Sequence, residues 1–407
     1  MPRSTISAAA GALALSCAGT LCALDLDTVE LHGFVSQGYL ETNRNEFIER
    51  SNEGTFSFGE AALTVTANPI DRLRVGAQVF ARNFGDSDQN GQLVLDWAYG
   101  DYRLHDLVGV RAGKIKFPKG LYNEIQDIDA ARTSILLPQS VYGTHLRDFW
   151  TSLLGASLYG STPSSVVGSF DYQVYIGTLN VPDDGTTAAY YGSGEETDVD
   201  VGHVSGFQLI WNAPVPGLRL GGSASHFDEM TLRVSPAEPL VMGPFVIPLD
   251  HTITLRSLDA YVLSAEYTLG DLRLAGEYSR QELVLDVRFD SPLLAGVTES
   301  PHIPGRGRAG PTDTEGWYLG ASYRLHPRFE LGTYYAHYWA DHRSQGDSPK
   351  HLFQGDLAIS ALFEVNPHWL IKAEFHNISG TALLPPAEAR SADEDWTLWA
   401  IKTTFTF

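Results

Sequence analysis

The sequence predicts an all-β protein, a transmembrane antiparallel β-barrel of 16 strands. Three observations point to this fold. Apolar and polar residues alternate along most of the chain with a period of two, the period of a strand that has two different faces. The connections between these runs alternate between short and long. The last run ends in a C-terminal phenylalanine, Phe407.

The alternation places charged residues on one face of the strands. In the run 72–82, one face carries Leu73, Val75, Ala77, Val79 and Ala81, and the other carries Arg72, Arg74, Gln78 and Arg82. A soluble β-sandwich would also alternate, but charges that face its core would be hard to satisfy. We therefore expect the polar face to line water and the apolar face to meet lipid. In lipid only a closed barrel leaves no strand edge unpaired.

The connections set the number of strands. Short ones, rich in Pro, Gly, Asn and Asp, have the composition of tight turns and fall at 68–71, 105–106, 212–217, 269–271, 326–327 and 366–368. Long ones fall near 41–54, 118–147, 181–201, 228–255, 284–314, 341–350 and 379–394. Counting the runs between them gives 16 strands, with seven turns at one end and eight loops at the other. The runs 148–160, 170–180 and 203–211 have the weakest strand pattern.

Aromatic residues near the strand ends support a membrane location. Tyr261 and Tyr267, Phe329 and Tyr335, and Trp369 and Phe375 are placed as two interfacial girdles would be. In the last run, 395–407, one face carries Trp399, Ile401, Thr403, Phe405 and Phe407. A terminal phenylalanine on such a strand is similar to the assembly signal of outer-membrane proteins.

The first 23 residues are predicted to be a cleaved signal peptide. Arg3 gives a positive start, 6–18 is a run of small and apolar residues, and Ala23 suits the cleavage site, with Ala18 as an alternative. Both cysteines, Cys17 and Cys22, lie in this segment, where lipidation is the alternative interpretation. The mature chain, 24–407, is expected to be one barrel domain without disulfides.

Charge and hydropathy exclude two other classes of protein. The formal net charge of −21 argues against nucleic-acid binding, which needs a basic surface. No run approaches the roughly 18 apolar residues of a membrane-spanning helix. A helical membrane protein is therefore excluded.

The connection 118–147 is predicted to fold into the barrel and narrow it. It is unusually long and carries many large apolar residues, including Leu121, Tyr122, Ile135 and Leu137. Such a composition does not suit a solvated tether, so we expect the loop to pack against the inner wall.

The charges expected at this narrowing come from both wall and loop. They are Arg74, Arg82, Arg111, Lys114, Lys116, Glu124, Asp127, Asp129 and Arg132. A basic wall opposite an acidic loop would create a transverse field and set an ion preference. The alternative for each residue is a local ion pair that holds the loop without touching solute. Lys114 and Lys116 share a phase with apolar residues, so either a bulge occurs near Gly113 or they lie at the outer interface.

The chain resembles Gram-negative trimeric porins, in particular the phosphate-selective-porin-like group. The segments that carry the resemblance are 31–40 (LHGFVSQGYL), 73–82 (LRVGAQVFAR), 98–124 (AYGDYRLHDLVGVRAGKIKFPKGLYNE), 132–142 (RTSILLPQSVY) and the last strand. The resemblance implies a trimer with periplasmic turns, extracellular loops and an inward third loop between strands five and six. Phosphate-selective members have a pronounced lysine cluster, of which this chain offers only Lys114, Lys116 and Lys119.

The expected function is passive diffusion of small hydrophilic solutes and ions across the outer membrane. The alternatives are a channel selective for phosphate or another anion, and a surface-binding or adhesin barrel with a blocked lumen. An enzyme is not expected, because His32, His145, His226, His337 and His376 stand in no hydrolase motif.

No cofactor or metal is expected. The segment 86–91 resembles half of a calcium loop, but Trp97 occupies the position of the bidentate acid, so a polar hairpin loop is the favoured interpretation. Outer-membrane lipid is an expected partner. Lipopolysaccharide, bridged by divalent ions to the acids of 183–200, is a second one.

Overall fold

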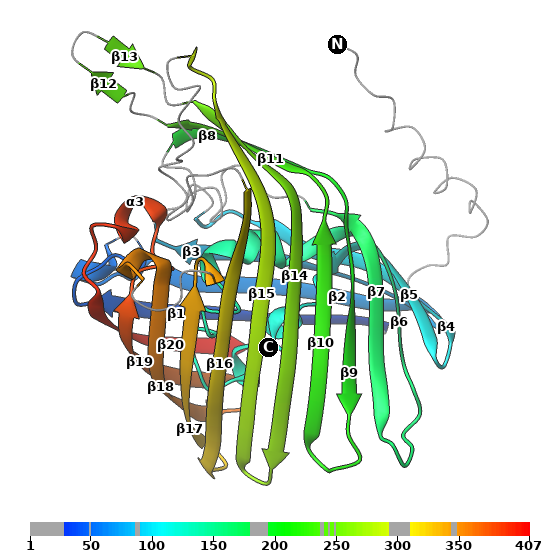
Figure 1. Ribbon diagram of the computed structural model, residues 1–407. Helices are drawn as coiled ribbons and strands as arrows, with labels where there is room; N and C mark the ends of the chain where they lie inside the picture. Colours follow the sequence, from blue (N-terminus) through cyan, green and yellow to red (C-terminus); the bar gives the residue numbers. More distant parts are fainter. Residues whose placement is uncertain are drawn as a thin grey trace, which may run out of the picture.

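In a computed structural model, sixteen strands form a closed antiparallel barrel (Figure 1). The structure describes residues 28–48, 50–85, 90–179, 194–236, 240–242, 245–247, 250–292, 310–342 and 348–407. The predicted signal peptide therefore lies outside the described residues. In order around the barrel the strands are β1 (Val29–Thr42), β2 (Phe58–Ile70), β3 (Leu73–Phe84), β4 (Val94–His105), β5 (Val108–Lys116), β6 (Ser152–Ser161), β7 (Ser169–Thr178), β9 (Val204–Asn212), β10 (Leu218–Phe227), β14 (His251–Leu269), β15 (Leu272–Phe289), β16 (Gly310–His326), β17 (Phe329–Trp339), β18 (Phe353–Asn366), β19 (Trp369–Gly380) and β20 (Asp395–Thr406).

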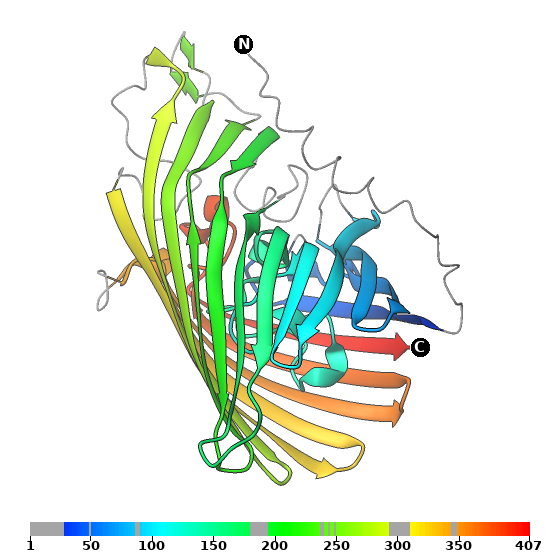
Figure 2. The ribbon, with the colours of Figure 1, turned by 90° about the vertical axis from the view of Figure 1, so that its right-hand side faces the viewer.

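The wall of the barrel is taller on one side. Strands β14, β15 and β16 have 19, 18 and 17 residues, whereas β5 has 9 and β6 has 10. Figures 1 and 2 show β14 and β15 rising above their neighbours, where β11 (Met230–Pro236) and β8 (Gly194–Val201) extend the same sheet. The short hairpin of β12 (Leu240–Met242) and β13 (Phe245–Ile247) lies at this end too. No helix among the described residues is long and apolar enough to cross a bilayer.

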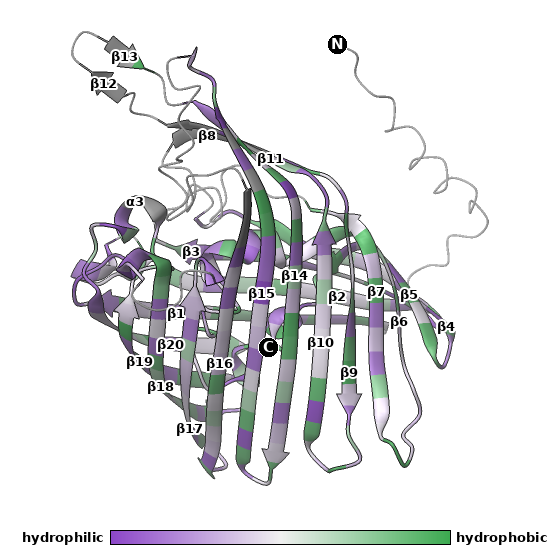
Figure 3. Cartoon of the chain, in the orientation of Figure 1, coloured by the Kyte–Doolittle hydropathy of each residue, from purple (hydrophilic) through white to green (hydrophobic). Residues whose placement is uncertain are grey.

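The predicted alternation is confirmed, with apolar residues outside and polar residues inside. Leu263 and Leu319 on the outer face are 63% and 67% exposed, whereas the inward Ser264 and Glu277 are buried. Figure 3 shows hydrophobic and hydrophilic residues alternating along β10, β14 and β15. An outer surface this apolar is costly in water, and lipid removes the cost.

The last strand closes the barrel against the first. Strand β20 pairs with β1 from Phe34 opposite Thr406 to Thr42 opposite Leu398. Phe407 then exchanges two backbone hydrogen bonds of 3.0 Å with Gly33. A Cβ atom at Gly33 would lie 2.4 Å from Cζ of the Phe407 ring, so only glycine leaves room for the terminal side chain.

Several boundaries differ from the sequence prediction. The strand expected from 148 begins at Ser152, because α1 (Arg147–Trp150) precedes it and buries Phe149 and Trp150. The loops expected at 181–201 and 228–255 contain β8 and β11, which pair with each other and continue the sheet beside β14. The loop expected at 284–314 is shorter, because β15 runs to Phe289 and β16 begins at Gly310. The described end of the proposed calcium loop closes a hairpin: the Asn90 side chain accepts from the Phe84 amide and donates to the Gly85 carbonyl. The acids of that loop lie outside the described residues.

We expect Gly33→Ala to weaken closure of the barrel, because the new methyl group displaces the Phe407 ring and crowds the Ala62 carbonyl. Overpacking of this kind costs roughly 1–3 kcal/mol. The measurement is the temperature at which the folded band converts to the unfolded band in gel electrophoresis. Gly100→Ala on β4 is the control, since a Cβ there meets nothing within 4 Å. Equal conversion temperatures for the two variants would contradict the role assigned to Gly33.

Candidate functional site

The third long connection lies inside the barrel, between the fifth strand β5 and the sixth strand β6. We call residues 117–151 loop L3. It contains three 3₁₀ turns, Asn123–Ile125, Asp129–Ala131 and Thr144–Leu146, followed by α1. These coils lie within the barrel in Figures 1 and 2. L3 follows the fifth strand, the position in strand order that the sequence analysis expects for an inward loop.

Aromatic packing fixes both ends of L3 to the wall. The Phe117 ring lies 5.1 Å from Trp150 and 5.9 Å from Phe227 of β10, centroid to centroid. Lys119 is buried beside them, with Nζ 4.2 Å from the Trp150 ring centre, and it donates to the Val141 carbonyl. Burial lowers the pKa of Lys119 to about 7. The ends of L3 therefore join a hydrophobic core rather than a water-filled lumen.

The middle of L3 packs on an apolar part of the inner wall. Leu137, Val141 and Tyr142 contact a cluster that includes Val262, Tyr318, Tyr334, Ala336 and Ala358 of β14, β16, β17 and β18. Ile135 and Leu136 join a second cluster with residues of β1, β2, β19 and β20. The inner wall is thus polar only in part.

Glu277 of β15 anchors the first part of L3. Its carboxylate accepts hydrogen bonds from the Leu121 amide (2.8 Å) and the Tyr142 hydroxyl (2.5 Å). Ser264 and Tyr318, its cross-strand neighbours on β14 and β16, donate to it as well. Four donors satisfy this carboxylate, which is 3% exposed. The wall thereby supplies partners that an irregular buried loop cannot find in itself.

Glu374 of β19 anchors the second part. It accepts from the amides of Ile135 (2.5 Å) and Leu136 (3.0 Å) and from Nε2 of His376 (2.8 Å). The other nitrogen of His376 lies 3.0 Å from both oxygens of Asp356. This histidine is therefore part of a structural network that orients Glu374.

Asp129 forms ion pairs with two buried lysines of the wall, one of which, Lys402, also pairs with Glu60. Lys372 and Lys402 are directly opposite each other on β19 and β20, and their ammonium groups lie 3.7 and 2.9 Å from the Asp129 carboxylate. Arg132 and the Thr404 hydroxyl complete the site, at 3.6 and 2.6 Å. Burial opposes ionisation of Asp129, but the surrounding cations outweigh it and hold its pKa well below the ordinary range.

Asp127 belongs to a second cluster, near β3 and β4. Arg147 lies 2.9 Å from Asp127 and 3.0 Å from Asp96, and Lys116 lies 3.7 Å from Asp127. The Gln78 amide donates to both carboxylates. The carboxylates of Asp127 and Asp129 are thus buried and paired, as in the local-pair alternative of the sequence analysis.

Arg82 and Arg111 pair with acids of neighbouring wall strands. Arg82 lies opposite Glu60 at 4.0 Å, and Arg111 lies 3.1 Å from Asp101. Arg74 is exposed and lies opposite Asp101 in the strand register.

The structure separates Lys114 from the other proposed residues. Its neighbours in register are Ala98 and the exposed Leu154, and its ammonium group donates to the Leu95 carbonyl. Lys114 therefore lies on the outer face, the second of the two positions considered from the sequence. Lys116 lies with the L3 residues and donates to the Glu124 carbonyl at 2.7 Å. Burial raises the pKa of the Glu124 carboxyl, although Arg111 and Lys116 lower it.

Arg132 is held by its own loop. Its terminal nitrogens donate to the carbonyls of Gln126 (2.7 Å) and Ile135 (3.2 Å). Its Nε is buried and has no hydrogen-bond partner among the described residues. The guanidinium is therefore fixed in position with one donor unused.

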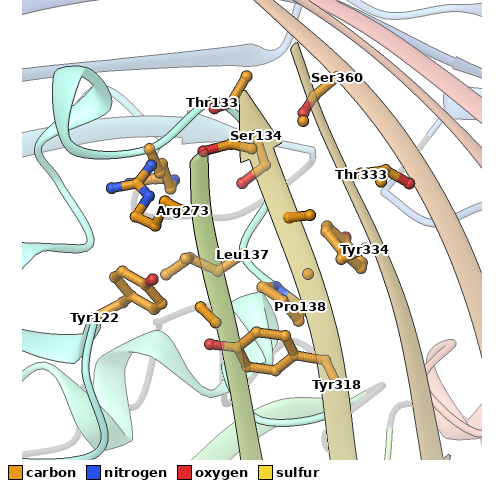
Figure 4. Close-up of a pocket in the computed structure, with 16 residues that line it drawn as sticks. Tyr122, Thr133, Ser134, Leu137, Pro138, Arg273, Tyr318, Thr333, Tyr334 and Ser360 are labelled. Atoms are coloured by element: carbon orange, nitrogen blue, oxygen red, sulfur yellow. The ribbon is translucent and has the colours of Figure 1, made fainter. Parts of the chain in front are cut away.

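Two pockets lie on either side of L3. The first, of about 480 Å³, lies between L3 and β15–β18 near the short turns, since Arg273 follows one turn closely and Ser322 precedes another (Figure 4). The second, of about 570 Å³, lies against β2 and β3 near the long loops, where Phe58 begins its strand and Phe84 ends its own. Both pockets are lined by Arg132 and Leu137. This part of L3 therefore separates the two.

Several residues that hold L3 were not singled out from the sequence. They are Glu277, Glu330, Glu374, Lys372, Lys402 and Arg147. Glu374 and Lys372 were visible as charges in the polar phase of a strand, but the sequence does not say which loop residue each one meets. Arg147 was included only as the last residue of the loop.

Comparison with known proteins identifies the fold. No protein-family model matches the chain, and no curated protein matches it in sequence. Among solved structures it is similar to OmpF of Salmonella typhi in complex with daunomycin (TM-score 0.58, 10% identity, 93% of this chain and 97% of that one). It is also similar to OprB of Pseudomonas putida (0.56, 12%, 94% and 95%) and to an anion-selective porin from Comamonas acidovorans (0.53, 14%, 93% and 99%). At these identities the similarity establishes a porin-type barrel fold. The resemblance to the phosphate-selective group stays a prediction.

We expect Glu277→Ala to release the first part of L3, because it leaves the hydroxyls of Tyr142 and Tyr318 without their acceptor and the Leu121 amide with only the Tyr142 hydroxyl. Unsatisfied buried donors cost about 1–3 kcal/mol each. The measurement is the rate at which a protease cuts L3 in the folded barrel in detergent.

The matched control is Glu282→Ala on the same strand, since Glu282 is partly exposed and pairs with Arg280. Glu277→Ala should raise cleavage at least about tenfold, the factor that corresponds to 1.4 kcal/mol, and Glu282→Ala should leave it unchanged. Resistance of both variants to the protease would show that Glu277 does not hold the loop.

Proposed function

We propose that the protein is an outer-membrane porin through which small hydrophilic solutes and ions diffuse passively. The observation that carries the proposal is a closed 16-strand barrel with its third long loop fastened inside. A barrel of this size is wide enough for an aqueous channel, and selectivity then depends on what narrows it. The proposed role is transport, and it involves no chemical reaction.

The proposed location is the Gram-negative outer membrane, reached through the predicted signal peptide. An exposed apolar outer face supports insertion into lipid. Exposed aromatic rings near strand ends do so too, such as Tyr323 of β16 and Phe405 of β20, both 48% exposed, whereas Tyr335 and Phe375, expected at strand ends, lie near the middle of β17 and β19. A homotrimer is part of the proposal on the basis of the resemblance to porins. Of the acids proposed to bridge to lipopolysaccharide, Glu195, Glu196, Asp198 and Asp200 lie on β8, and Asp183 and Asp184 lie outside the described residues.

The proposed route leads from the second pocket past Arg132 and Leu137 into the first. These two residues line both pockets, and L3 is anchored on either side of them through Leu121 and Tyr142. A solute on this route therefore passes a guanidinium group of fixed position. The narrowest part of the route is proposed to be this segment.

The charge along this route favours anions. The first pocket is lined by two arginines and no acid. The second is lined by four basic residues, Arg82, Arg132, Arg147 and Lys402, and by two acidic ones, Glu60 and Asp127, so positive charges outnumber negative ones. Anion preference is consistent with the anion-channel alternative, and the lining does not single out phosphate.

A barrel with a blocked lumen is the second candidate, since L3 meets the wall in many directions. It makes hydrogen bonds or ion pairs with β3, β4, β5, β9, β10, β14, β15, β16, β17, β19 and β20. In that case the long loops at the tall end of the barrel would bind a partner at the cell surface.

Conductance decides between these candidates. We expect the purified protein to give steady ion-conducting openings in planar bilayers, with a reversal potential in a KCl gradient that indicates preference for chloride. A protein that inserts and passes no current would overturn the porin proposal and favour the blocked barrel. A preference for potassium would overturn the proposed route.

We expect Asp129→Asn to move the reversal potential further toward chloride. The change removes one negative charge and leaves Lys372, Lys402 and Arg132 in place. It also destabilises the folded barrel, because breaking a buried ion pair costs about 3–5 kcal/mol. Asp106→Asn, in the exposed short turn between β4 and β5, is the control and should change neither quantity. An unchanged reversal potential in folded Asp129→Asn would place Asp129 away from the ion path.

A further inference from the structure

We propose that the pocket between L3 and strands β15–β18 binds small organic carboxylates, those with an aromatic or short apolar body. This inference rests on the proposed function, because it names a class of solute that would pause on the proposed route. The pocket volume of about 480 Å³ includes space that is open to solvent, so a solute can reach its lining from the lumen.

The charges of the pocket select an anion. Arg132 from L3 and Arg273 from β15 line it, and none of its lining residues is an aspartate or a glutamate. Glu330 lies just outside, 3.5 Å from Arg273 and 3.2 Å from Arg324, and also accepts from Thr133. Two arginines therefore already share this nearby carboxylate. Arg132 likewise lies 3.6 Å from Asp129, so each arginine of the pocket has an acidic partner that does not line the pocket itself.

Both guanidinium groups are held in place before a ligand arrives. Arg132 donates to the Gln126 and Ile135 carbonyls, and Arg273 donates to the Ala131 carbonyl at 3.0 Å. A guanidinium with a fixed orientation loses little entropy when it binds a carboxylate, whose two oxygens match its planar donors. This rigidity favours a carboxylate over a spherical ion such as chloride.

The rest of the lining suits the body of an organic anion. Tyr122, Tyr318 and Tyr334 line the pocket, and each hydroxyl donates to a glutamate or aspartate of the wall. With those hydroxyls occupied, the rings add apolar surface to that of Leu137. Figure 4 shows Arg273 and Tyr122 on one side of Leu137, and Tyr334 on the other. Ser134 and Ser360 also line the pocket and offer hydroxyls to a second polar group, whereas the hydroxyls of Thr133 and Thr333 already donate to Glu330 and to the Ala358 carbonyl.

Benzoate is the probe, with benzamide as a neutral molecule of the same shape. In bilayers with KCl, benzoate should block the current in a saturable way, and benzamide should block at least about ten times more weakly. Arg273→Gln should raise the half-blocking concentration of benzoate about tenfold, equivalent to 1.4 kcal/mol. Arg273→Lys should recover part of that loss, because lysine restores the positive charge but not the planar N–H donors of the guanidinium.

Arg74→Gln is the matched control, since Arg74 is also on the lumen side of a strand and lines neither pocket. It should change the half-blocking concentration less than twofold. Equal effects of Arg273→Gln and Arg74→Gln would overturn the site. They would indicate only that positive charge in the lumen attracts anions without a specific site. Equal block by benzamide and benzoate would overturn the selection for carboxylates.

Calorimetric titration of the protein in detergent separates this inference from the proposed function. If the barrel passes no current but binds benzoate, and Arg273→Gln weakens that binding about tenfold, the site stands and the porin proposal fails. If it conducts and shows no saturable benzoate binding, the site fails and the porin proposal stands. Each variant is first shown to be folded by its heat-dependent shift in gel electrophoresis.

Discussion

The structure depends on the way the inner wall satisfies the backbone of L3. An irregular loop buried inside a barrel carries N–H and C=O groups that have no ladder to join, and each unpaired one is costly. Glu277 and Glu374 accept its amides at two places 14 residues apart, at Leu121 and at Ile135. Gln208, Arg273 and Lys372 donate to its carbonyls. The wall is therefore polar where the loop needs partners and apolar where the loop brings Leu137 and Val141.

This arrangement changes the meaning of the acidic residues of L3. Asp127 and Asp129 stand in the sequence beside Glu124 as if to form an acidic edge. In the structure each is surrounded by cations, so each neutralises charge on the wall. Lys372 and Lys402 face each other across β19 and β20, and like charges in that position repel unless an anion lies between them. The net charge of −21 therefore gives no guide to the lining of the two pockets, where positive groups outnumber negative ones.

The fold could be predicted from the sequence because one face of each strand meets lipid and the other meets water. Apolar and polar residues therefore alternate along the strand with a period of two. The run 72–82 shows this, and the register of β3 places its faces as expected. The anchoring of L3 could not be predicted, because Glu277 lies 156 residues from Leu121 and Glu374 lies 239 from Ile135. Inward apolar residues such as Val262 and Ala358 also contradict a simple polar-inside rule. These residues pack against the apolar side of L3, which lies in another part of the chain. Lys114 shows the remaining ambiguity. Gly113 beside it has a φ of 130°, so the alternation of residues there does not decide whether Lys114 faces the lumen or the lipid.

The separation of the two pockets by Arg132 and Leu137 bears on how the lumen would work. These residues lie beside the attachment of Ile135 and Leu136 to Glu374, and the Arg132 guanidinium donates to two carbonyls of L3 itself. A loop that moved to open a passage would have to break the hydrogen bonds to Glu374, and the Asp129 contacts three residues earlier as well. Widening the route by loop motion is therefore costly. Under the proposed function, fixed side chains would decide the size and charge of the solutes that pass, as in a filter rather than a gate.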